Sequence, residues 1–217
     1  MDIDINNTWL ISDTHFGHEN IKGFCHRPDD FEQIIMEEWA RAVGEDDTII
    51  HLGDLSYRGN AWFQNMIAKH LTGNKYLILG NHDRKTRNFY RKCGFKILKP
   101  QEFYVIENSG YGLVTTDKPS RRSYTISLSH YPATEVLKDN EIRIHGHIHN
   151  NGYTRDAFVP FLKNHINISV EQTKYKPVHL KLLLEAVILG TYPESSADPS
   201  GEVEADALPS KKEQTYG

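Results

Sequence analysis

The chain has 217 residues, 38% of them hydrophobic and 25% charged, which suits one domain with a substantial core. Its formal net charge of −4 argues against broad nonspecific binding of nucleic acid, although it does not exclude a local basic patch. Two cysteines without a CxxC spacing argue against a disulfide framework, and the lack of a long apolar run or a basic N-terminal leader predicts a cytoplasmic protein that does not bind membranes.

The first half of the sequence alternates short apolar strands with amphipathic helices. We expect strands at residues 8–12, 48–52 and 76–79, and helices at 31–43 and 61–71. Strands separated by helices form βαβ units, which require a parallel sheet with right-handed crossovers. The carboxyl ends of the three strands should therefore lie along one edge of the sheet.

The second half contains closely spaced aromatic and β-branched runs that favour antiparallel strands. Residues 103–107, 111–115 and 124–129 predict an antiparallel meander, because turn residues separate them. Residues 142–145 and 166–170 suit two further strands, and 180–189 suit a packed helix. From Thr191 onward there is almost no large apolar residue. We therefore expect a single domain over residues 1–190 and a polar tail, disordered or loosely docked, over 191–217.

Candidate metal-binding side chains follow the expected strands, at the points where apolar runs end. They are Asp13 and His15, Asp54, Asn81 with His82 and Asp83, His130, and His147 with His149. One such residue is ordinary, since aspartates form turns and a lone histidine is more often structural than a ligand. Five such blocks need another explanation, because no packing rule repeats carboxylates and imidazoles at one edge of a sheet. A ligand set of oxygen and nitrogen without thiolates suits Mn, Fe, Ni or Zn, and its size suits two ions that share a bridging carboxylate.

The order of these blocks resembles the calcineurin-like metallophosphoesterase superfamily. The blocks read Asp-x-His, Gly-Asp, Gly-Asn-His-Asp, His and Gly-His-x-His, and the match runs from about Trp9 to Val170. The resemblance implies an α/β fold, in which a central β-sandwich of mixed sheets is flanked by helices in four layers.

The resemblance also implies a role for each candidate residue. Asp54 would bridge two divalent ions, with Mn²⁺ as the first candidate. The implied ligand sets are Asp13, His15 and His149 for one ion, and Asn81, His130 and His147 for the other. His82 would stabilise the phosphoryl oxygens or protonate the leaving group, and Asp83 would orient its imidazole.

Two departures separate this chain from the protein phosphatases of that superfamily. Tyr57 stands where they have a second aspartate, and Asp83 stands where they have a glutamate. The Gly146-His147-Ile148-His149 block and the opening Asp13 to Ile21, followed by Arg27-Pro28, resemble small bacterial and phage members instead. A protein phosphatase is therefore disfavoured.

The expected activity is hydrolysis of a phosphodiester or phosphomonoester bond. It would proceed by in-line attack of a metal-bound hydroxide, with His82 as the acid. The expected substrate is a nucleotide-like small molecule. Two alternatives remain open: a metal-dependent nuclease that acts on nucleic-acid ends, and a non-catalytic binding scaffold on the same fold.

Four further side chains have two interpretations each. His18 and Arg58 could contact the substrate phosphate, or they could be a surface turn histidine and a surface ion-pair partner. His51 and His145 lie within expected strands, where core packing or support of neighbouring ligands is favoured over ligation.

Overall fold

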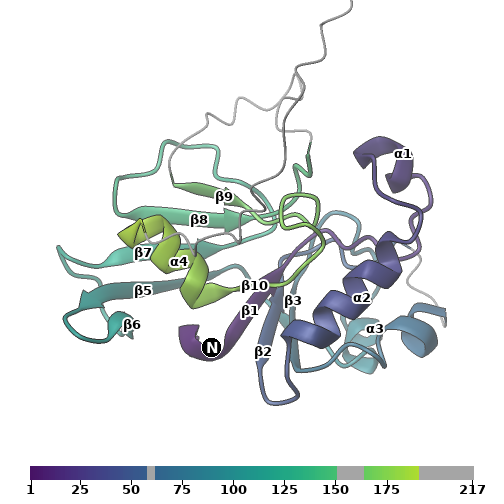
Figure 1. The fold of residues 1–217 in the computed structure, drawn as a ribbon, viewed down its shortest axis with the longest axis horizontal. Coiled ribbons are helices and arrows are strands. Elements are labelled where there is room, and N and C mark those ends of the chain that lie inside the picture. Colours follow the sequence, from purple (N-terminus) through teal and green to yellow (C-terminus); the bar gives the residue numbers. More distant parts are fainter. Residues whose placement is uncertain (58–61, 151–163, 191–217) are drawn as a thin grey trace, which may run out of the picture.

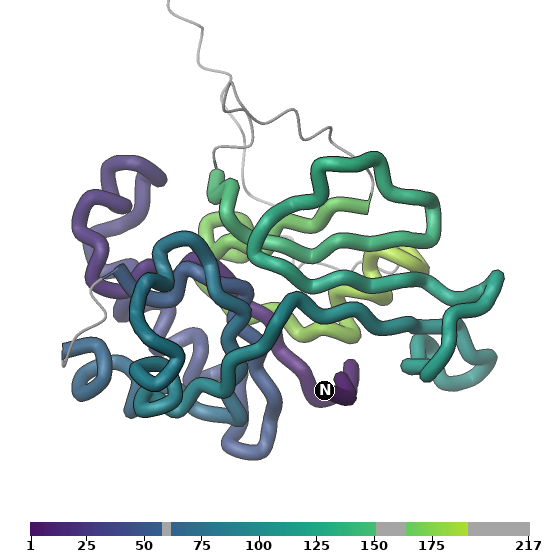
Figure 2. The backbone as a smooth tube through the Cα atoms, turned by 180° about the vertical axis from the view of Figure 1, so that it is seen from behind, coloured from purple at the N-terminus to yellow at the C-terminus, as the bar shows by residue number. Residues whose placement is uncertain are grey.

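Two five-stranded sheets form the centre of the molecule (Figure 1). The computed structural model describes residues 1–57, 62–150 and 164–190, so Arg58 and the expected tail at 191–217 lie outside the described residues. The N-terminal part of the chain lies on one side of the molecule and the later strands lie on the other (Figure 2). The expected sandwich of mixed sheets flanked by helices is confirmed.

The first sheet contains the three strands expected from the first half of the sequence. Its strand order is β10-β1-β2-β3-β4, with bounds Val178–His179, Thr8–Ile11, Thr48–His51, Asn74–Ile78 and Lys96–Leu98. Strands β1 to β4 are parallel, and β10 is antiparallel to β1. Ile11 pairs with His51, and His51 pairs with Leu77. The carboxyl ends of β1, β2 and β3 therefore lie together at one edge, as expected.

The second sheet differs from the expected meander. Its order is β6-β5-β7-β8-β9, with bounds Gly112–Thr116, Gln101–Asn108, Tyr124–Leu128, Glu141–His145 and His165–Asn167. β5 is the centre of an antiparallel trio, so β7 pairs with β5 rather than with β6. β7, β8 and β9 are parallel to one another. The connection over residues 129–140 is long enough for the crossover that a parallel pair requires.

Helices pack on the outer face of the first sheet and against the core between the two sheets. Helix α2 (Phe31–Ala42) and helix α4 (Leu180–Leu189) confirm two of the expected helices. The described residues also form the short helices α1 (Ile21–Cys25) and α3 (Arg87–Lys92) and the 3₁₀ turn η1 (Ile5–Asn7). The helix expected at 61–71 is instead the π-helical turn η2 (Phe63–Ile67), closed by a hydrogen bond from the backbone N–H of Ala68 to the carbonyl of Phe63. Phe63 and Ile67 are both buried, so the wide turn still places its apolar side chains in the core.

Successive residues of the parallel strands enter two different cores. Ile11 and Ile49 join the core beneath α2, together with Trp39, whereas Leu10 and Ile50 join the core between the two sheets. This alternation follows from the two-residue period of a strand that is covered on both faces.

The two sheets meet at the carboxyl ends of their parallel strands. Ser12, directly after β1, bridges to Ser169, and the N–H of Val170 donates to the carbonyl of Ser12 at 3.2 Å. In α/β sheets ligands bind outside this edge of the strands. Among the described residues, no helix is long and apolar enough to cross a membrane.

Candidate metal centre

The seven expected ligands all follow the carboxyl ends of parallel strands at the junction of the two sheets. Asp13 and His15 follow β1, Asp54 follows β2, Asn81 follows β3, His130 follows β7, and His147 and His149 follow β8. The fold thus brings together side chains that are up to 136 positions apart in the sequence, from Asp13 to His149. Their role as metal ligands stays a prediction.

Five of these residues have left-handed backbone conformations, with positive φ. The φ angles are 60° for Asp13, 51° for His15, 57° for Asp54, 73° for His147 and 50° for His149. Such a conformation costs a non-glycine residue about 1–3 kcal/mol, and it persists only where surrounding contacts impose it. Here the N–H of Asp13 donates to the carbonyl of Gly53, and the N–H of His15 donates to the carbonyl of Asp54, each at 3.0 Å. The concentration of strain at this edge points to a functional site.

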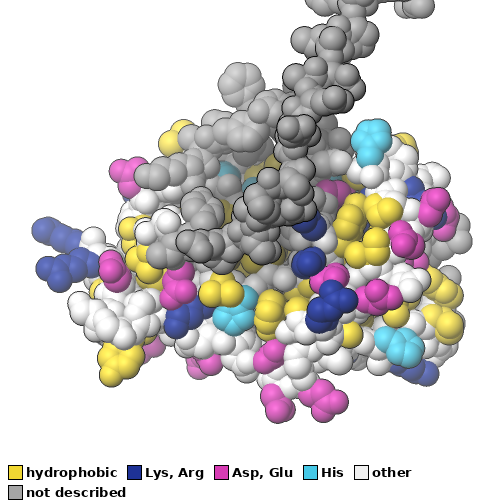
Figure 3. Space-filling model, viewed as in Figure 1, with side chains coloured by type: hydrophobic (Ala, Val, Ile, Leu, Met, Phe, Trp, Pro, Cys, Tyr) yellow, Lys and Arg dark blue, Asp and Glu magenta, His cyan; other side chains and the backbone are white. Residues whose placement is uncertain are grey.

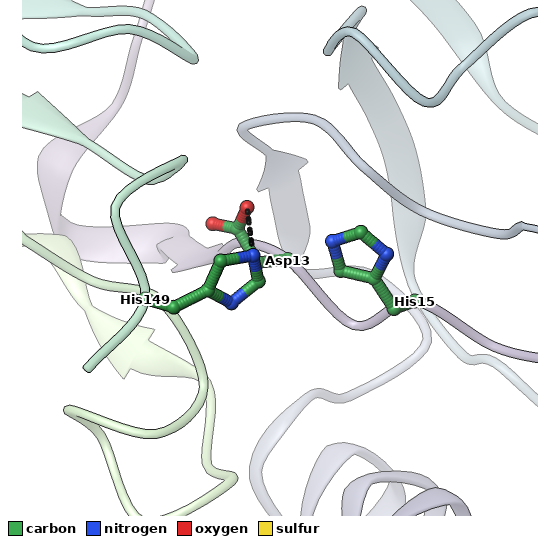
Figure 4. Close-up of side chains that lie close together, drawn as sticks. All are labelled: Asp13, His15 and His149. Carbon is green, nitrogen blue, oxygen red and sulfur yellow. Dashed lines mark ion pairs between the residues drawn. The ribbon is translucent and has the colours of Figure 1, made fainter. Parts of the chain in front are cut away.

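Asp13, His15 and His149 form one cluster, which we call the inner cluster. Each offers one nitrogen or oxygen atom, and these atoms lie within 4.8 Å of one another. Figure 4 shows the imidazoles of His15 and His149 near the Asp13 carboxylate, whose Oδ1 lies 3.8 Å from Nε2 of His149. Nε2 of His15 is buried and has no hydrogen-bond partner among the described residues. A buried imidazole nitrogen without a partner fits a metal ligand, because such a group is otherwise costly.

Asp54, His130 and His147 form a second set within the same 4.8 Å limit, and Asn81 adjoins it. We call Asn81, His130 and His147 the outer cluster. Nε2 of His130 lies 2.9 Å from Oδ1 of Asn81 and 3.2 Å from Nδ1 of His147. Three ligand atoms that converge in this way suit a divalent ion with oxygen and nitrogen ligands.

Asp54 lies between the two clusters. Its Oδ2 is 3.4 Å from Nε2 of His15 and 3.5 Å from Nε2 of His130. Burial alone would raise the pKa of the Asp54 carboxyl, but the close approach of His15 and the charges of His130 and His15 hold it well below its ordinary value. A carboxylate that stays ionised between two imidazole groups is placed to bridge two cations.

Two glycines let the backbone approach these carboxylates closely. A Cβ atom at Gly80 would overlap the Asp54 carboxylate, and one at Gly146 would overlap Asp13 and Ser12. Glycine is required at both positions for steric reasons. The Gly-Asn-His-Asp and Gly-His-x-His blocks therefore begin with glycine because each packs directly on a candidate ligand.

Glu171 and Arg27 support the inner cluster, and sequence reasoning did not identify them as part of the site. Nδ1 of His149 donates to Oε1 of Glu171 at 3.0 Å, and the buried Arg27 guanidinium donates to the same oxygen from Nε at 2.8 Å and from Nη2 at 2.6 Å. Arg27 also donates to the carbonyls of Asp13 at 2.7 Å and Thr14 at 2.8 Å. A signal for Glu171 was present, since it directly follows the expected strand 166–170.

These contacts set the charge of His149 when no metal is bound. Burial opposes its protonation, but the Cys25 thiol and the Glu171 carboxylate outweigh that effect and raise the pKa of His149 to about 10. A metal ion would have to displace this proton, because only the neutral imidazole binds metal.

The described contacts of Asp83 are with the backbone of neighbouring loops. Its carboxylate accepts three backbone N–H bonds, from Asp54 at 2.7 Å, Gly80 at 2.8 Å and Leu55 at 3.1 Å, and no described contact joins it to the His82 imidazole. The physical reason is that the turn after β3 packs on the loop after β2, where these N–H groups lack other partners. Asp83 thus holds the loop that carries Asp54, and its expected role in orienting His82 stays a prediction.

His82 and His18 lie beside the inner cluster. The ring centre of His82 is 5.1 Å from that of His15, and its backbone N–H donates to Oδ1 of Asp54 at 2.8 Å. His18 is buried rather than exposed: Nδ1 lies 3.2 Å from Nδ1 of His15, and its ring stacks flat on Tyr57. Burial lowers the pKa of His18 to about 4, so its ring is neutral near pH 7.

His51 and His145 are buried, as expected for strand residues that support the site. Nε2 of His51 lies 3.0 Å from the hydroxyl of Thr14, and its Nδ1 accepts the N–H of Gly53 at 3.1 Å. Thr14 lies between Asp13 and His15, and Gly53 precedes Asp54. His51 therefore joins the loops after β1 and β2, and burial lowers its pKa to about 3.

Comparison with known proteins identifies the family. The model of the calcineurin-like phosphoesterases matches residues 7–166. An uncharacterized protein of Methanocaldococcus jannaschii is 32% identical over 193 residues, which cover 87% of this chain and 95% of that protein. The gene 66 protein of Mycobacterium phage L5 is 28% identical over 166 residues, which cover 67% of this chain and 78% of that protein. A solved structure of a protein of unknown function from Aquifex aeolicus has 28% identity and a TM-score of 0.53, and the match covers 79% of this chain and 94% of that one.

The chain belongs to the calcineurin-like phosphoesterase family. The resemblance expected from its motifs is thereby confirmed. Membership implies a metal-dependent hydrolase of phosphoester bonds, and the structure contains groups of side chains that could hold metal ions.

Proposed function

We propose that this protein is a two-metal phosphoesterase that cleaves a phosphodiester bond in a nucleotide-like substrate. The observation that carries the proposal is the position of Asp54. Its Oδ2 lies 3.4 Å from Nε2 of His15 in the inner cluster and 3.5 Å from Nε2 of His130 in the outer cluster. A single ion would not need ligands on both sides of this carboxylate.

The donor set fits divalent transition metals. The seven proposed ligands offer carboxylate, amide and imidazole groups and no thiolate, which suits Mn²⁺ first, and also Fe, Ni or Zn. When bound, two such ions lower the pKa of water and stabilise the negative charge on the phosphoryl oxygens. The chain's own part is to hold the ligands in place through the strained backbone and the contacts of Arg27, Glu171 and His51.

His82 is the proposed acid for the leaving group. Its backbone N–H is fixed on Asp54, and among the described residues its imidazole has no hydrogen-bond partner. An imidazole that is anchored through its backbone but makes no side-chain hydrogen bond is available to a substrate oxygen, and imidazole is the commonest general acid in enzymes.

Hydrolysis of bis-p-nitrophenyl phosphate with added Mn²⁺ tests the proposal. We expect activity that chelation removes and that added metal restores. Asp54→Ala should abolish it, because this change removes the shared carboxylate. Asp139→Ala, an exposed aspartate whose side chain has no described contact, is the matched control and should retain activity.

Full activity in a chelated, metal-free sample would contradict the proposal. A purified protein that contains no metal and takes up none would favour the alternative of a non-catalytic scaffold on the same fold.

A further inference from the structure

A pocket of about 400 Å³ opens beside His82. Ser56, Tyr57, His82, Arg84 and Lys85 line it. Its volume lies in the range of about 300–1,000 Å³ that is typical of small-molecule sites. None of its lining residues except His82 has a role in the proposed hydrolysis, so the pocket needs a separate explanation.

Two cations in this pocket lack carboxylate partners. Arg84 and Lys85 are exposed, and neither forms an ion pair with a described residue. Nε of Arg84 donates to the carbonyl of Asn81 at 3.3 Å, which keeps the guanidinium close to the turn after β3. Both cations line the same pocket. They form a site for an anion with several acceptor oxygens, such as a phosphate.

An aromatic ring also lines the pocket. The ring of Tyr57 stacks on His18 with ring centres 4.0 Å apart and an interplanar angle of 9°, yet Tyr57 remains 53% exposed. Its ring centre lies 6.0 Å from that of His82. The stack with His18 fixes the Tyr57 ring, and a ring fixed in this way offers a platform on which a planar base can stack.

The charge distribution on one face of the molecule favours local sites over a broad basic one. On the described part of the face in Figure 3, acidic and basic side chains lie among each other rather than in one basic area. Binding of an anionic substrate would therefore depend on a few placed cations.

We propose that this pocket binds the leaving-group side of the substrate, with a base stacked on Tyr57 and a second phosphate held by Arg84 and Lys85. This inference rests on the proposed function. Hydrolysis adds one water across the P–O bond: the hydroxyl goes to phosphorus and the P–O bond to the leaving group breaks. His82 gives a proton to the departing oxygen, the water's own proton goes to solvent, and His82 regains a proton from solvent. Because the pocket adjoins His82, the group that departs is the one that fills it. The preferred substrate is then a nucleotide unit that carries a further phosphate beyond the scissile one.

The test compares substrates with and without that second phosphate. Thymidine dinucleotides are assayed unphosphorylated, with a 5′-terminal phosphate and with a 3′-terminal phosphate, beside bis-p-nitrophenyl phosphate. For wild type, one terminal phosphate should lower KM about tenfold, the change expected for one charge-assisted hydrogen bond. Arg84→Gln with Lys85→Gln should remove this difference. Tyr57→Ala should raise KM for the dinucleotides more than for bis-p-nitrophenyl phosphate.

Matched variants separate the pocket from general charge effects. Arg91→Gln with Lys92→Gln removes the same two charges from the exposed end of α3 and should keep the tenfold preference. Lys85→Gln alone leaves the contact between Arg84 and Asn81 in place and should give part of the loss. Equal KM changes for substrates with and without the terminal phosphate would overturn the inference, as would hydrolysis of bis-p-nitrophenyl phosphate without any dinucleotide cleavage.

Failure of the inference is distinguishable from failure of the proposed function. If wild type with Mn²⁺ does not hydrolyse bis-p-nitrophenyl phosphate or any dinucleotide, the proposed function fails. If it hydrolyses them without preference for the terminal phosphate, only the inference fails. Where wild type does prefer the terminal phosphate, a single-stranded oligothymidylate identifies the source of the second phosphate. Faster cleavage than that of the dinucleotide indicates a polynucleotide end, slower cleavage indicates a free dinucleotide, and both support the pocket.

Discussion

The inner and outer clusters offer similar ligands but are supported differently. In the inner cluster, His149 donates to Glu171, which is held by the buried Arg27, and Arg27 also binds the backbone next to Asp13. In the outer cluster, His130 has its Nδ1 2.9 Å from the carbonyl of Leu52, and among the described residues no charged side chain contacts that nitrogen. A carboxylate on the far nitrogen of a ligand imidazole fixes the ring and increases its basicity.

This difference indicates that the two proposed ions are not equivalent. The inner ion should bind more tightly, because Glu171 supports the imidazole of His149 and Arg27 fixes the backbone of Asp13. The outer ion should exchange more readily. Asp54 is a proposed ligand of both ions. Its loss should therefore remove both ions, and with them the difference in affinity.

The largest expected effect separates catalysis from metal binding within one turn. His82→Ala should lower turnover about 10²–10⁴-fold, the range for loss of a general acid, while both ions stay bound. Asn81→Ala should instead lower occupancy of the outer ion, because it removes a ligand. Metal content by mass spectrometry and turnover are measured on the same samples. Equal loss of metal in both variants would show that His82 is not separate from the ligands.

A smaller effect tests the support of the inner cluster directly. Glu171→Gln keeps the shape of the side chain but removes its charge, and should weaken the inner ion about 10–100-fold with the outer ion unaffected. Equilibrium dialysis against Mn²⁺ measures both affinities. Glu37→Gln, an exposed change on α2, is the matched control. Equal weakening of the two ions would remove the distinction between the clusters.

The smallest effect appears only on acidification. It concerns His51, which joins the loops after β1 and β2. His51 has an ordinary pKa of 6.5 that burial lowers to about 3, so it stays neutral in the folded protein while the unfolded chain takes up a proton below pH 6.5. The unfolded state then binds more protons, and the free energy of unfolding of the metal-free protein should fall by roughly 2 kcal/mol from pH 7 to pH 5 through this group.

Urea unfolding at several pH values measures this loss. His51→Gln should flatten the pH dependence by that amount, whereas the exposed His70→Gln should not. A pH dependence unchanged in His51→Gln would show that the buried imidazole is not its source.

The parallel half of the fold and the convergence of the candidate ligands were predictable from the sequence. Strands β1, β2 and β3 are apolar runs that end in polar turns, and a parallel sheet must bring such ends together. The order of the second sheet was not predictable in this way, since the pairing of β7 with β5 depends on long-range contacts rather than on turn residues. Local spacing favours a meander, and tertiary packing decided otherwise.

Support residues were harder to predict than ligands. Arg27 lies in the segment between α1 and α2 and has no strand-end signal, and it reaches Glu171 across 144 positions of sequence. The position of Asp83 after an expected strand marked it as a site residue. The direction in which its side chain points depends on which backbone N–H groups need a partner, and only the packed loops show this. A sequence motif identifies which groups a site contains, whereas their hydrogen bonds follow from the fold.

Titration of the chelated protein with Mn²⁺, monitored by calorimetry and by activity on the same samples, tests the central claim most directly. We predict two ions per chain with unequal affinities, activity that requires metal, and selective weakening of the tighter step in Glu171→Gln. Saturation at a single ion, or full activity before any metal is added, would contradict the two-metal centre bridged by Asp54.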